Sequence, residues 1–284
     1  MIDLSIIIVT YNSEKFIGEC LRSVKKYTKE IDYEVIVVDN ASTDGTVEEF
    51  KTQSSKLKTA TQNLKLIFNK ENVGFSKANN QGIKVAHGRY VLLLNPDTKL
   101  TENSFLSMVL WMDEHPKAGV ATCGLVNPDG TTQSTGGFFP ILPRVFLWAT
   151  FMDDIPLVQE VFGSYHPHTW FSFYKKEREL DWVTGAFFMI RREVLDQVGM
   201  LDEDFFLYVE EVEYSLRIKK SNWKIWYVPK TRIIHHGGAS GTREGMIFRE
   251  YAGLKLLYQK HYGLWQRIAL SFLLFFGSLV RIMV

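Results

Sequence analysis

Three hydrophobic runs near the start of the chain are each followed by polar side chains that could bind a nucleotide. Thr10-Tyr11-Asn12 follows the first run, Asp39-Asn40 the second and Asn95-Pro96-Asp97 a later one. Open α/β sheets bind ligands beyond the carboxyl ends of their strands, so these groups would meet at one edge. There an aromatic ring can stack on a nucleobase, and a carboxylate can accept hydrogen bonds from the base or the ribose. The pattern predicts a nucleoside pocket, although each group taken singly also fits a turn with a helix cap.

Asp97 is the candidate for binding a metal and a diphosphate. It follows a proline at the end of a buried run, which holds its carboxylate rigidly at the ligand rim. Hard divalent cations need oxygen ligands of this kind and also take oxygens from a diphosphate. Mg²⁺ or Mn²⁺ at this position would neutralise charge that develops on a leaving diphosphate. His235, at the end of the strand-like run 232–236, is a second candidate ligand and His236 a lesser one, with a structural histidine as the alternative.

The elements that must position these groups alternate between strand and helix through the first hundred residues. Continuous β-branched runs favour strands that are buried on both faces of a parallel sheet. The predicted strands cover residues 4–11, 33–39, 64–69 and 90–95, and the predicted helices follow Asn12-Ser13 and cover residues 43–54 and 76–86. This alternation is typical of a doubly wound α/β half.

Beyond Pro96 the pattern is irregular. Extended segments are predicted at residues 120–126, 182–190 and 224–228, and residues 136–174 are rich in glycine, proline and aromatic side chains. We expect a mixed sheet here, with long loops of the kind that often bind ligands.

The C-terminal tail, residues 264–284, is strongly apolar. Its uncharged core, residues 268–280 between Arg267 and Arg281, falls short of the roughly 20 residues that a membrane-spanning helix needs. A helix lying in the membrane interface is the favoured interpretation. The alternative is a terminal helix packed on the protein's own core.

Composition narrows the class of protein. The chain has 284 residues, which suits one sizeable domain with an appendage, and its net charge is +1 from 33 basic and 32 acidic residues. Such a balance argues against nucleic acid as a partner. The two cysteines, Cys20 and Cys123, are too few for a disulfide framework, so a reducing cytoplasmic compartment fits best.

Nine motifs occur in order along residues 3–240. They are TYN (10–12), VVDNASTDGT (37–46), NVGFSKANNQG (72–82), GRY (88–90), LNPD (94–97), TGA (184–186), GMLDEDFF (199–206), EEVE (210–213) and HHGGAS (235–240). Together the first five resemble the family 2 inverting glycosyltransferases, and the last four resemble the rhamnosyltransferase-like branch of that family. The resemblance implies a GT-A fold with a mixed central sheet, flanking helices and a C-terminal helical appendage.

The resemblance also implies roles for the matching positions. Tyr11 and Asp39 would bind the base and ribose, and Asp97, with His235, would stand in the metal and diphosphate position. The implied donor-binding residues are Thr10, Tyr11, Asn12, Asp39, Asn40, Gly74, Lys77, Asn79, Asn80, Asn95 and Asp97, and those on the acceptor side are Trp182, Thr184 and Gly185.

The family's catalytic base falls on Glu211, beside Glu210. This sequence departs from the family at this point, because the second acid is usually aspartate, and Glu213 also replaces a common aspartate. The extra methylene moves the carboxylate by about one bond length, and a displacement of about 1 Å can matter for catalysis. The alternative is that the three acids form only a solvated helix start that favours the macrodipole.

The expected protein is a glycosyltransferase that moves a sugar from a dTDP- or UDP-linked donor to a glycan or lipid-linked acceptor in polysaccharide synthesis, and the branch resemblance favours rhamnose from dTDP-rhamnose. We expect a catalytic domain at residues 1–242, with its nucleotide half at about 1–100 and its acceptor half at about 101–242. Residues 243–284 are expected to hold it peripherally on the inner face of the cell membrane. The alternatives are a nucleotidyltransferase, whose usual glycine-rich basic loop after the first strand is absent, and a non-catalytic nucleotide-sugar-binding protein of the same fold.

Overall fold

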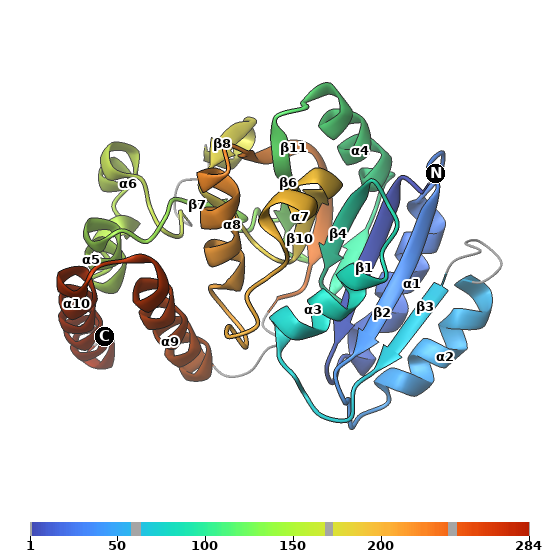
Figure 1. Ribbon diagram of the computed structural model, residues 1–284, viewed down its shortest axis with the longest axis horizontal. Helices are drawn as coiled ribbons and strands as arrows, with labels where there is room; N and C mark the ends of the chain where they lie inside the picture. Colours follow the sequence, from blue (N-terminus) through green and yellow to red (C-terminus); the bar gives the residue numbers. More distant parts are fainter. Residues whose placement is uncertain (1, 58–63, 168–172, 238–242, 284) are drawn as a thin grey trace.

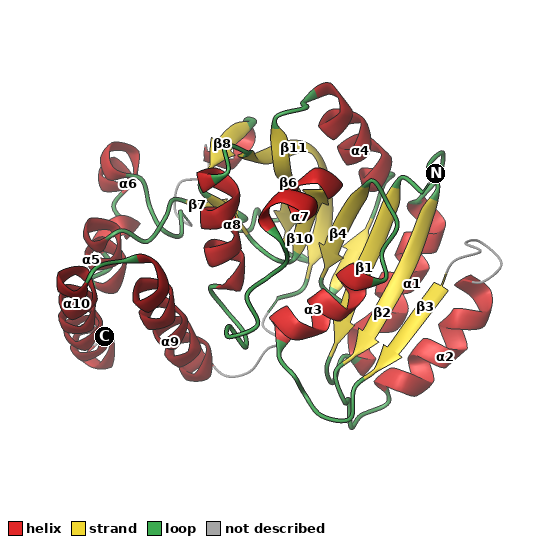
Figure 2. Cartoon of the chain, in the orientation of Figure 1, coloured by secondary structure: helices red, strands yellow, loops and turns green. Residues whose placement is uncertain are grey.

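The computed structural model describes residues 2–57, 64–167, 173–237 and 243–283. These residues build a mixed sheet of nine strands in the order β3-β2-β1-β4-β10-β6-β11-β5, with β8 also paired to β11. Helices cover both faces of the sheet, and further helices extend beyond one end of it (Figure 1, Figure 2). The predicted mixed sheet with flanking helices and a C-terminal helical appendage is therefore confirmed.

The N-terminal half is parallel, as its β-branched runs predict. Its strands are β1 (Leu4–Thr10), β2 (Tyr33–Asp39), β3 (Leu64–Phe68) and β4 (Tyr90–Leu94). The helices between them are α1 (Glu14–Tyr27), α2 (Thr46–Leu57) and α3 (Phe75–Lys84). In the β1–β2 register Thr10 pairs with Asp39, so the polar groups that follow the two strands emerge at the same edge.

Further strands complete the sheet; their pairings are antiparallel except that of β6 with β11, which is parallel. They include β5 (Thr98–Leu100), β6 (Ala118–Val126), β8 (Arg178–Leu180), β10 (Phe187–Arg191) and β11 (Lys224–His235), while β7 (Gly136–Gly137) pairs separately with β9 (Trp182–Val183). The predicted extended segment 182–190 is thus split into β9 and β10. The predicted segment 224–228 continues instead to His235, through a shift of register against β6.

Two cores lie on the two faces of the sheet. One packs α1, Phe50 of α2 and α4 (Ser104–Glu114) against the sheet. The other packs α3, α7 (Arg192–Val198) and α8 (Glu210–Lys220) against the opposite face. The sheet is therefore buried between helices, and its strand ends are left to form the site.

A third core joins the C-terminal helices to the rest of the protein. It contains Trp148, Val212, Leu254, Leu270 and Leu274. The elements involved or adjoining are α5 (Leu142–Ala149), η1 (Met152–Asp154), α6 (Pro156–Phe162), α9 (Arg243–His261) and α10 (Leu264–Met283), whereas η2 (Phe173–Lys175) packs in the second core. One face of α10 thus packs on the protein, as the alternative interpretation of the tail had it.

The opposite face of α10 is exposed, with Trp265 81% and Phe272 62% accessible. Within the described ranges, no helix is long and apolar enough to cross a bilayer. The predicted domain boundary at residue 242 falls outside the described residues and stays a prediction.

Candidate active site

The ends of β1 and β2 form one side of the candidate site. The Thr10 hydroxyl donates to Asp39 Oδ1 at 3.0 Å, and Ser42 donates to the same carboxylate from its amide at 3.0 Å and its hydroxyl at 2.6 Å. Asp39 is therefore fixed in one orientation. Tyr11 follows on the rim with half of its surface exposed, so its ring is accessible for stacking on a base.

Asn12 holds the two loops of this edge together. It adopts a left-handed φ of 49°, and its side-chain oxygen accepts from the Thr43 amide at 2.8 Å. Its own amide donates to the Ser42 hydroxyl at 3.0 Å. The loop after β1 is thereby tied to the loop after β2, as a shared binding edge requires.

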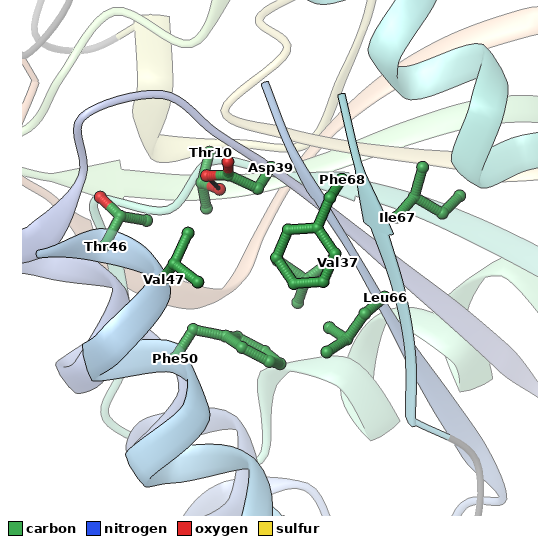
Figure 3. Close-up of a pocket in the computed structure, with 9 residues that line it drawn as sticks. All are labelled: Thr10, Val37, Asp39, Thr46, Val47, Phe50, Leu66, Ile67 and Phe68. Carbon is green, nitrogen blue, oxygen red and sulfur yellow. Dashed lines mark hydrogen bonds between the residues drawn. The ribbon is translucent and has the colours of Figure 1, made fainter. Parts of the chain in front are cut away.

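A small pocket lies beside Asp39, between α2 and strands β2 and β3 (Figure 3). Thr10 and Asp39 line one side of the pocket, and the apolar side chains of Val47, Phe50 and Phe68 line the rest of it. Its volume of ≈ 10 Å³ holds about one water molecule. The pocket is therefore too small to be the predicted nucleoside site, and the placement of that site at Tyr11 and Asp39 stays a prediction.

Two of the predicted donor-binding asparagines are engaged inside the protein. The Asn40 side chain donates to Asn72 Oδ1 at 2.7 Å and to the Gly74 carbonyl at 3.3 Å. The Asn80 side chain exchanges two hydrogen bonds with the Leu201 backbone, at 2.9 and 3.1 Å. Both are almost fully buried, so these contacts position the loops around the site. Direct contact of either with a nucleotide stays a prediction.

Gly74 opens α3 with φ of 87°, and only glycine fits there. A Cβ at this position would lie 2.8 Å from the Phe206 carbonyl oxygen. The Phe75 amide donates to that same carbonyl at 2.7 Å, which draws the 199–206 motif against the start of α3. Lys77 is exposed one turn later, whereas Asn79 is buried and donates to the Phe75 carbonyl at 3.0 Å.

Asp97 and His235 meet at the other end of the edge, with Asp97 Oδ1 3.3 Å from His235 Nε2. Gln133 Nε2 donates to the His235 carbonyl at 2.6 Å, which leaves Gln133 Oε1 as the acceptor for His235 Nδ1 at 2.8 Å. The proton of a neutral His235 therefore sits on Nδ1, and the lone pair of Nε2 faces the carboxylate. The gap between them favours a positive charge, supplied either by a second proton on His235 or by a cation.

The chemistry of this pair fits a divalent metal. Burial raises the pKa of the Asp97 carboxyl, but the hydrogen bond and charge of His235 and the Gly237 amide together hold that pKa below its ordinary value. Gln133 orients His235 as outer-shell partners orient metal-binding histidines. Among the described residues, no group of three His, Cys, Asp or Glu side chains could hold an ion, so the candidate site rests on this pair.

The neighbours of this pair differ in their placement. Asn95 Nδ2 lies 3.4 Å from His235 Nε2, so Asn95 belongs to the same cluster. His236 instead packs against the Phe16 ring at 5.1 Å and lies 3.9 Å from Glu19. The rest of the motif, residues 238–240, lies outside the described residues. Gln133 has no motif around it, and only the fold brings it to His235.

Glu210 and Glu211 form an acid pair at the start of α8. The Glu210 side chain is buried, whereas Glu211 is partly exposed as a residue although its Oε2 atom is buried. Burial, the charge of Glu211 and a hydrogen bond to Glu211 raise the pKa of Glu210 well above its ordinary value. Burial also raises the pKa of Glu211, to about 7. Near neutral pH the pair therefore holds one proton, mainly on Glu210, and Glu211 is the more readily ionised member.

The hydrogen bonding of the pair differs from that of Glu213, the third acid of the motif. Within the described residues, one carboxyl oxygen of each, Oε2, is buried and has no hydrogen-bond partner. Glu213, by contrast, accepts from Arg217 at 2.9 Å and lies 2.9 Å from His261 of α9, so it links two helices. A solvated acidic helix start is wrong for Glu210 and Glu213, because they are only 4% and 1% exposed.

A strained turn immediately precedes the acid pair. Tyr208 and Val209, immediately before it, both adopt left-handed backbone conformations, with φ of 72° and 71°. A β-branched residue at positive φ is a true outlier and costs about 1–3 kcal/mol. Gly253 of α9 lies against this turn: a Cβ there would be 2.7 Å from Val209 Cγ2 and 2.9 Å from the Tyr208 carbonyl oxygen. Helix α9 therefore holds the turn from outside.

Side chains from distant segments surround the pair. His166 Nε2 lies 2.7 Å from Glu250 Oε1, and both charges act on Glu211: Glu250 raises its pKa and His166 lowers it. The Tyr165 ring packs on His166 at 4.1 Å. None of these three residues lies in a motif, so the sequence did not point to them.

The predicted acceptor-side residues lie close together in the sequence: Trp182 is in β9, and Thr184 and Gly185 are in the turn that follows it. The buried Trp182 donates its indole N–H to the Phe138 carbonyl at 3.2 Å. The Thr184 amide donates to the Thr135 carbonyl at 3.0 Å, and a Cβ on Gly185 would lie 3.3 Å from Phe75. These contacts place the TGA turn between β9 and β10, and its acceptor role stays a prediction.

Residues 5–199 match Glycosyl transferase family 2. The chain belongs to this family. It is similar to the N-acetylglucosaminyl-diphospho-decaprenol L-rhamnosyltransferase of Mycobacterium tuberculosis, at 27% identity in an alignment of 259 positions that covers 85% of this chain and 78% of that protein. The predicted glycosyltransferase activity, of hexosyltransferase type, is thereby confirmed, and the nucleotidyltransferase and the non-catalytic binding protein are disfavoured.

Solved structures confirm the GT-A fold. The mannosyltransferase PcManGT from Pyrobaculum calidifontis, in complex with GDP-Man and Mn²⁺, has a TM-score of 0.64 at 17% identity, over 98% of this chain and 73% of that one. Staphylococcus aureus TarS 1-349, in complex with UDP-GlcNAc, has a TM-score of 0.55 at 22% identity, over 96% of this chain and 70% of that one.

Substituting Gly253→Ala should disturb the acid pair through the turn. The added methyl group would lie 2.7 Å from Val209 Cγ2, so the turn or α9 must move. Overpacking of this kind costs about 1–3 kcal/mol of unfolding free energy. We expect a lower melting temperature and a lower turnover with donor affinity retained. Gly263→Ala is the control, because the nearest atom there is 3.7 Å away. Equal turnover in the two variants would contradict the prediction.

Proposed function

We propose that this glycosyltransferase works by a single displacement that inverts the anomeric centre, with Glu211 as the general base. The observation that carries this proposal is the acid pair, in which Glu211 is poised to ionise near neutral pH. Glu211 would take the proton of the acceptor hydroxyl while that oxygen attacks the anomeric carbon and the nucleoside diphosphate leaves. Glu210, which retains its proton, donates a hydrogen bond to Glu211 and keeps it in place.

The donor would bind along the edge formed by β1, β2 and β4. Tyr11 would stack on the base and Asp39 would accept hydrogen bonds from the base or ribose. Asp97 and His235 would hold Mg²⁺ or Mn²⁺, and the bound ion would supply positive charge to the leaving diphosphate. The short distance between these two side chains and the orientation of His235 by Gln133 support this assignment.

The rhamnosyltransferase relative supports dTDP-rhamnose as the donor, with a UDP-linked sugar as the second candidate. That relative acts on N-acetylglucosaminyl-diphospho-decaprenol, which supports a lipid-linked or glycan acceptor for this chain as well. We place the enzyme on the cytoplasmic face of the cell membrane, in contact with it through α10. A screen of nucleotide sugars for hydrolysis in the presence of Mg²⁺ or Mn²⁺ tests the donor directly.

The Glu211→Gln variant should bind donor normally and transfer poorly. The amide keeps the size of the side chain but cannot accept the proton, and general-base catalysis is worth about 10²- to 10⁴-fold. Turnover and donor affinity, measured separately, give the comparison. Glu210→Gln is the matched variant next to it. If Glu210→Gln loses turnover and Glu211→Gln does not, the base is Glu210; wild-type rates in both would remove the acid pair from the mechanism.

The rate should depend on pH through Glu211. Its pKa is raised to about 7, so below that pH the carboxyl is protonated and cannot act as the base. We expect kcat/KM to rise with pH up to about 7 and to fall about tenfold for each pH unit below it. The residual activity of Glu211→Gln should lack this limb. A wild-type profile that stays flat down to pH 5 would contradict the assignment.

The Asp97→Ala variant should lose metal-dependent donor binding. His235 alone remains as a protein ligand, and no acid adjoins Asp97 in the sequence to replace it. Calorimetry with a nucleoside diphosphate, with and without Mn²⁺, measures the effect. We expect the Mn²⁺-dependent gain in affinity to disappear, and an unchanged gain would place the metal elsewhere.

A further inference from the structure

The exposed apolar side chains of α10 form a stripe along one face. Trp265, Phe272, Phe275 and Phe276 are 81%, 62%, 61% and 58% exposed. With Ile268 and Leu279 they recur every three or four residues, so they share one side of the helix. The packed residues Leu270 and Leu274 lie on the other side. Helix α10 is therefore apolar on both faces, although only one of them has a protein partner in the described chain.

A second exposed apolar segment comes from a distant part of the sequence. On α6, Leu157, Val161 and Phe162 are 69%, 65% and 56% exposed, and Ile155 just before the helix is 50% exposed. Helix α6 packs on η1, η1 packs on α5, and α5 packs on α10. The two segments thus belong to one helical layer at the same end of the molecule (Figure 1).

Basic groups accompany the apolar stripe. A notch of ≈ 270 Å³ between α9 and α10 is lined by Lys255 and Arg267, with Ile268 on its apolar side. Of the residues that the structure describes, no acidic side chain lines the notch. Both basic side chains are exposed, and among the described residues neither forms an ion pair with an acid. Helix α10 itself contains no acidic residue.

We propose that α6 and α10 together form one membrane-docking face, with the Lys255–Arg267 notch receiving anionic lipid headgroups. Aromatic and aliphatic side chains beside unpaired cations are the signature of helices that lie in the interface of an anionic bilayer. A second copy of this chain fits less well, because a two-fold contact would bring the same basic notch of both copies to one interface. The inference deepens the proposed membrane contact through α10 by adding α6 and the notch.

Docking in this way would bring the acceptor side of the site to the bilayer. The third core joins α10 and α5 to Val209 and Val212, which flank the acid pair. An acceptor carried on a membrane lipid would therefore reach Glu211 from the end of the molecule that contacts the bilayer. This consequence rests on the proposed catalytic role of Glu211. The docking face itself does not depend on that role.

Vesicle sedimentation of the full chain, without donor or acceptor, tests the docking face independently of catalysis. Vesicles of phosphatidylcholine alone are compared with vesicles that also contain phosphatidylglycerol. The variants are Phe272→Ser on α10, Leu157→Ser on α6 and the double change Lys255→Gln with Arg267→Gln. Leu110→Ser on α4 is the matched control, because Leu110 is a similarly exposed leucine outside this layer. A melting curve for each variant confirms that it is folded.

We expect Phe272→Ser and Leu157→Ser each to weaken binding about fivefold or more, because each removes an inserted apolar side chain. The double basic variant should lose the preference for phosphatidylglycerol, and Leu110→Ser should bind like the wild type. If Leu157→Ser binds like the wild type, the two-segment face is refuted. A dimer in light scattering that Phe272→Ser dissociates, with unchanged vesicle binding, would also overturn it by assigning the face to a second copy.

Discussion

Two neighbouring carboxyl groups, Glu210 and Glu211, lie side by side at the start of α8, and much of the surrounding structure serves to keep them there. Two ionised carboxylates in contact repel each other, so the pair holds a proton near neutral pH and one member can accept another. The left-handed turn at Tyr208 and Val209 aims them inward, and Gly253 of α9 supports that turn. The proposed catalytic base is thus held in place at a cost in backbone strain.

The polar groups at the ends of β1, β2 and β4 are held in place in a different way. Parallel pairing of β1 with β2 and β4 brings three loops to one edge, where their polar groups fix one another. Asp39 is held by Thr10 and Ser42, and Asp97 is held opposite His235. These contacts fix the carboxylates in advance, so little side-chain freedom would be lost if a nucleotide binds there as proposed.

The C-terminal helices connect these two parts with the outer surface. Helix α9 contributes Gly253 to the strained turn and Glu250 to the surroundings of Glu211, and His261 bonds to Glu213 of α8. Helix α10 packs on α5 and leaves its other face exposed. The sequence predicts residues 243–284 as a membrane-associated appendage. In the structure, these helices also pack around the acid pair and hold the turn before it.

The sequence by itself determined the parallel half, the edge where Tyr11, Asp39 and Asp97 emerge, and the family, because β-branched runs and short motifs are local signals. It also pointed to Glu211, through its motif. Only the tertiary structure decided that Glu210 is buried and holds the proton, that Gln133 orients His235, and that His166 and Glu250 act on Glu211. Burial, charge coupling and hydrogen-bond partners depend on residues far apart in the chain, and no local pattern encodes which of them the fold brings together.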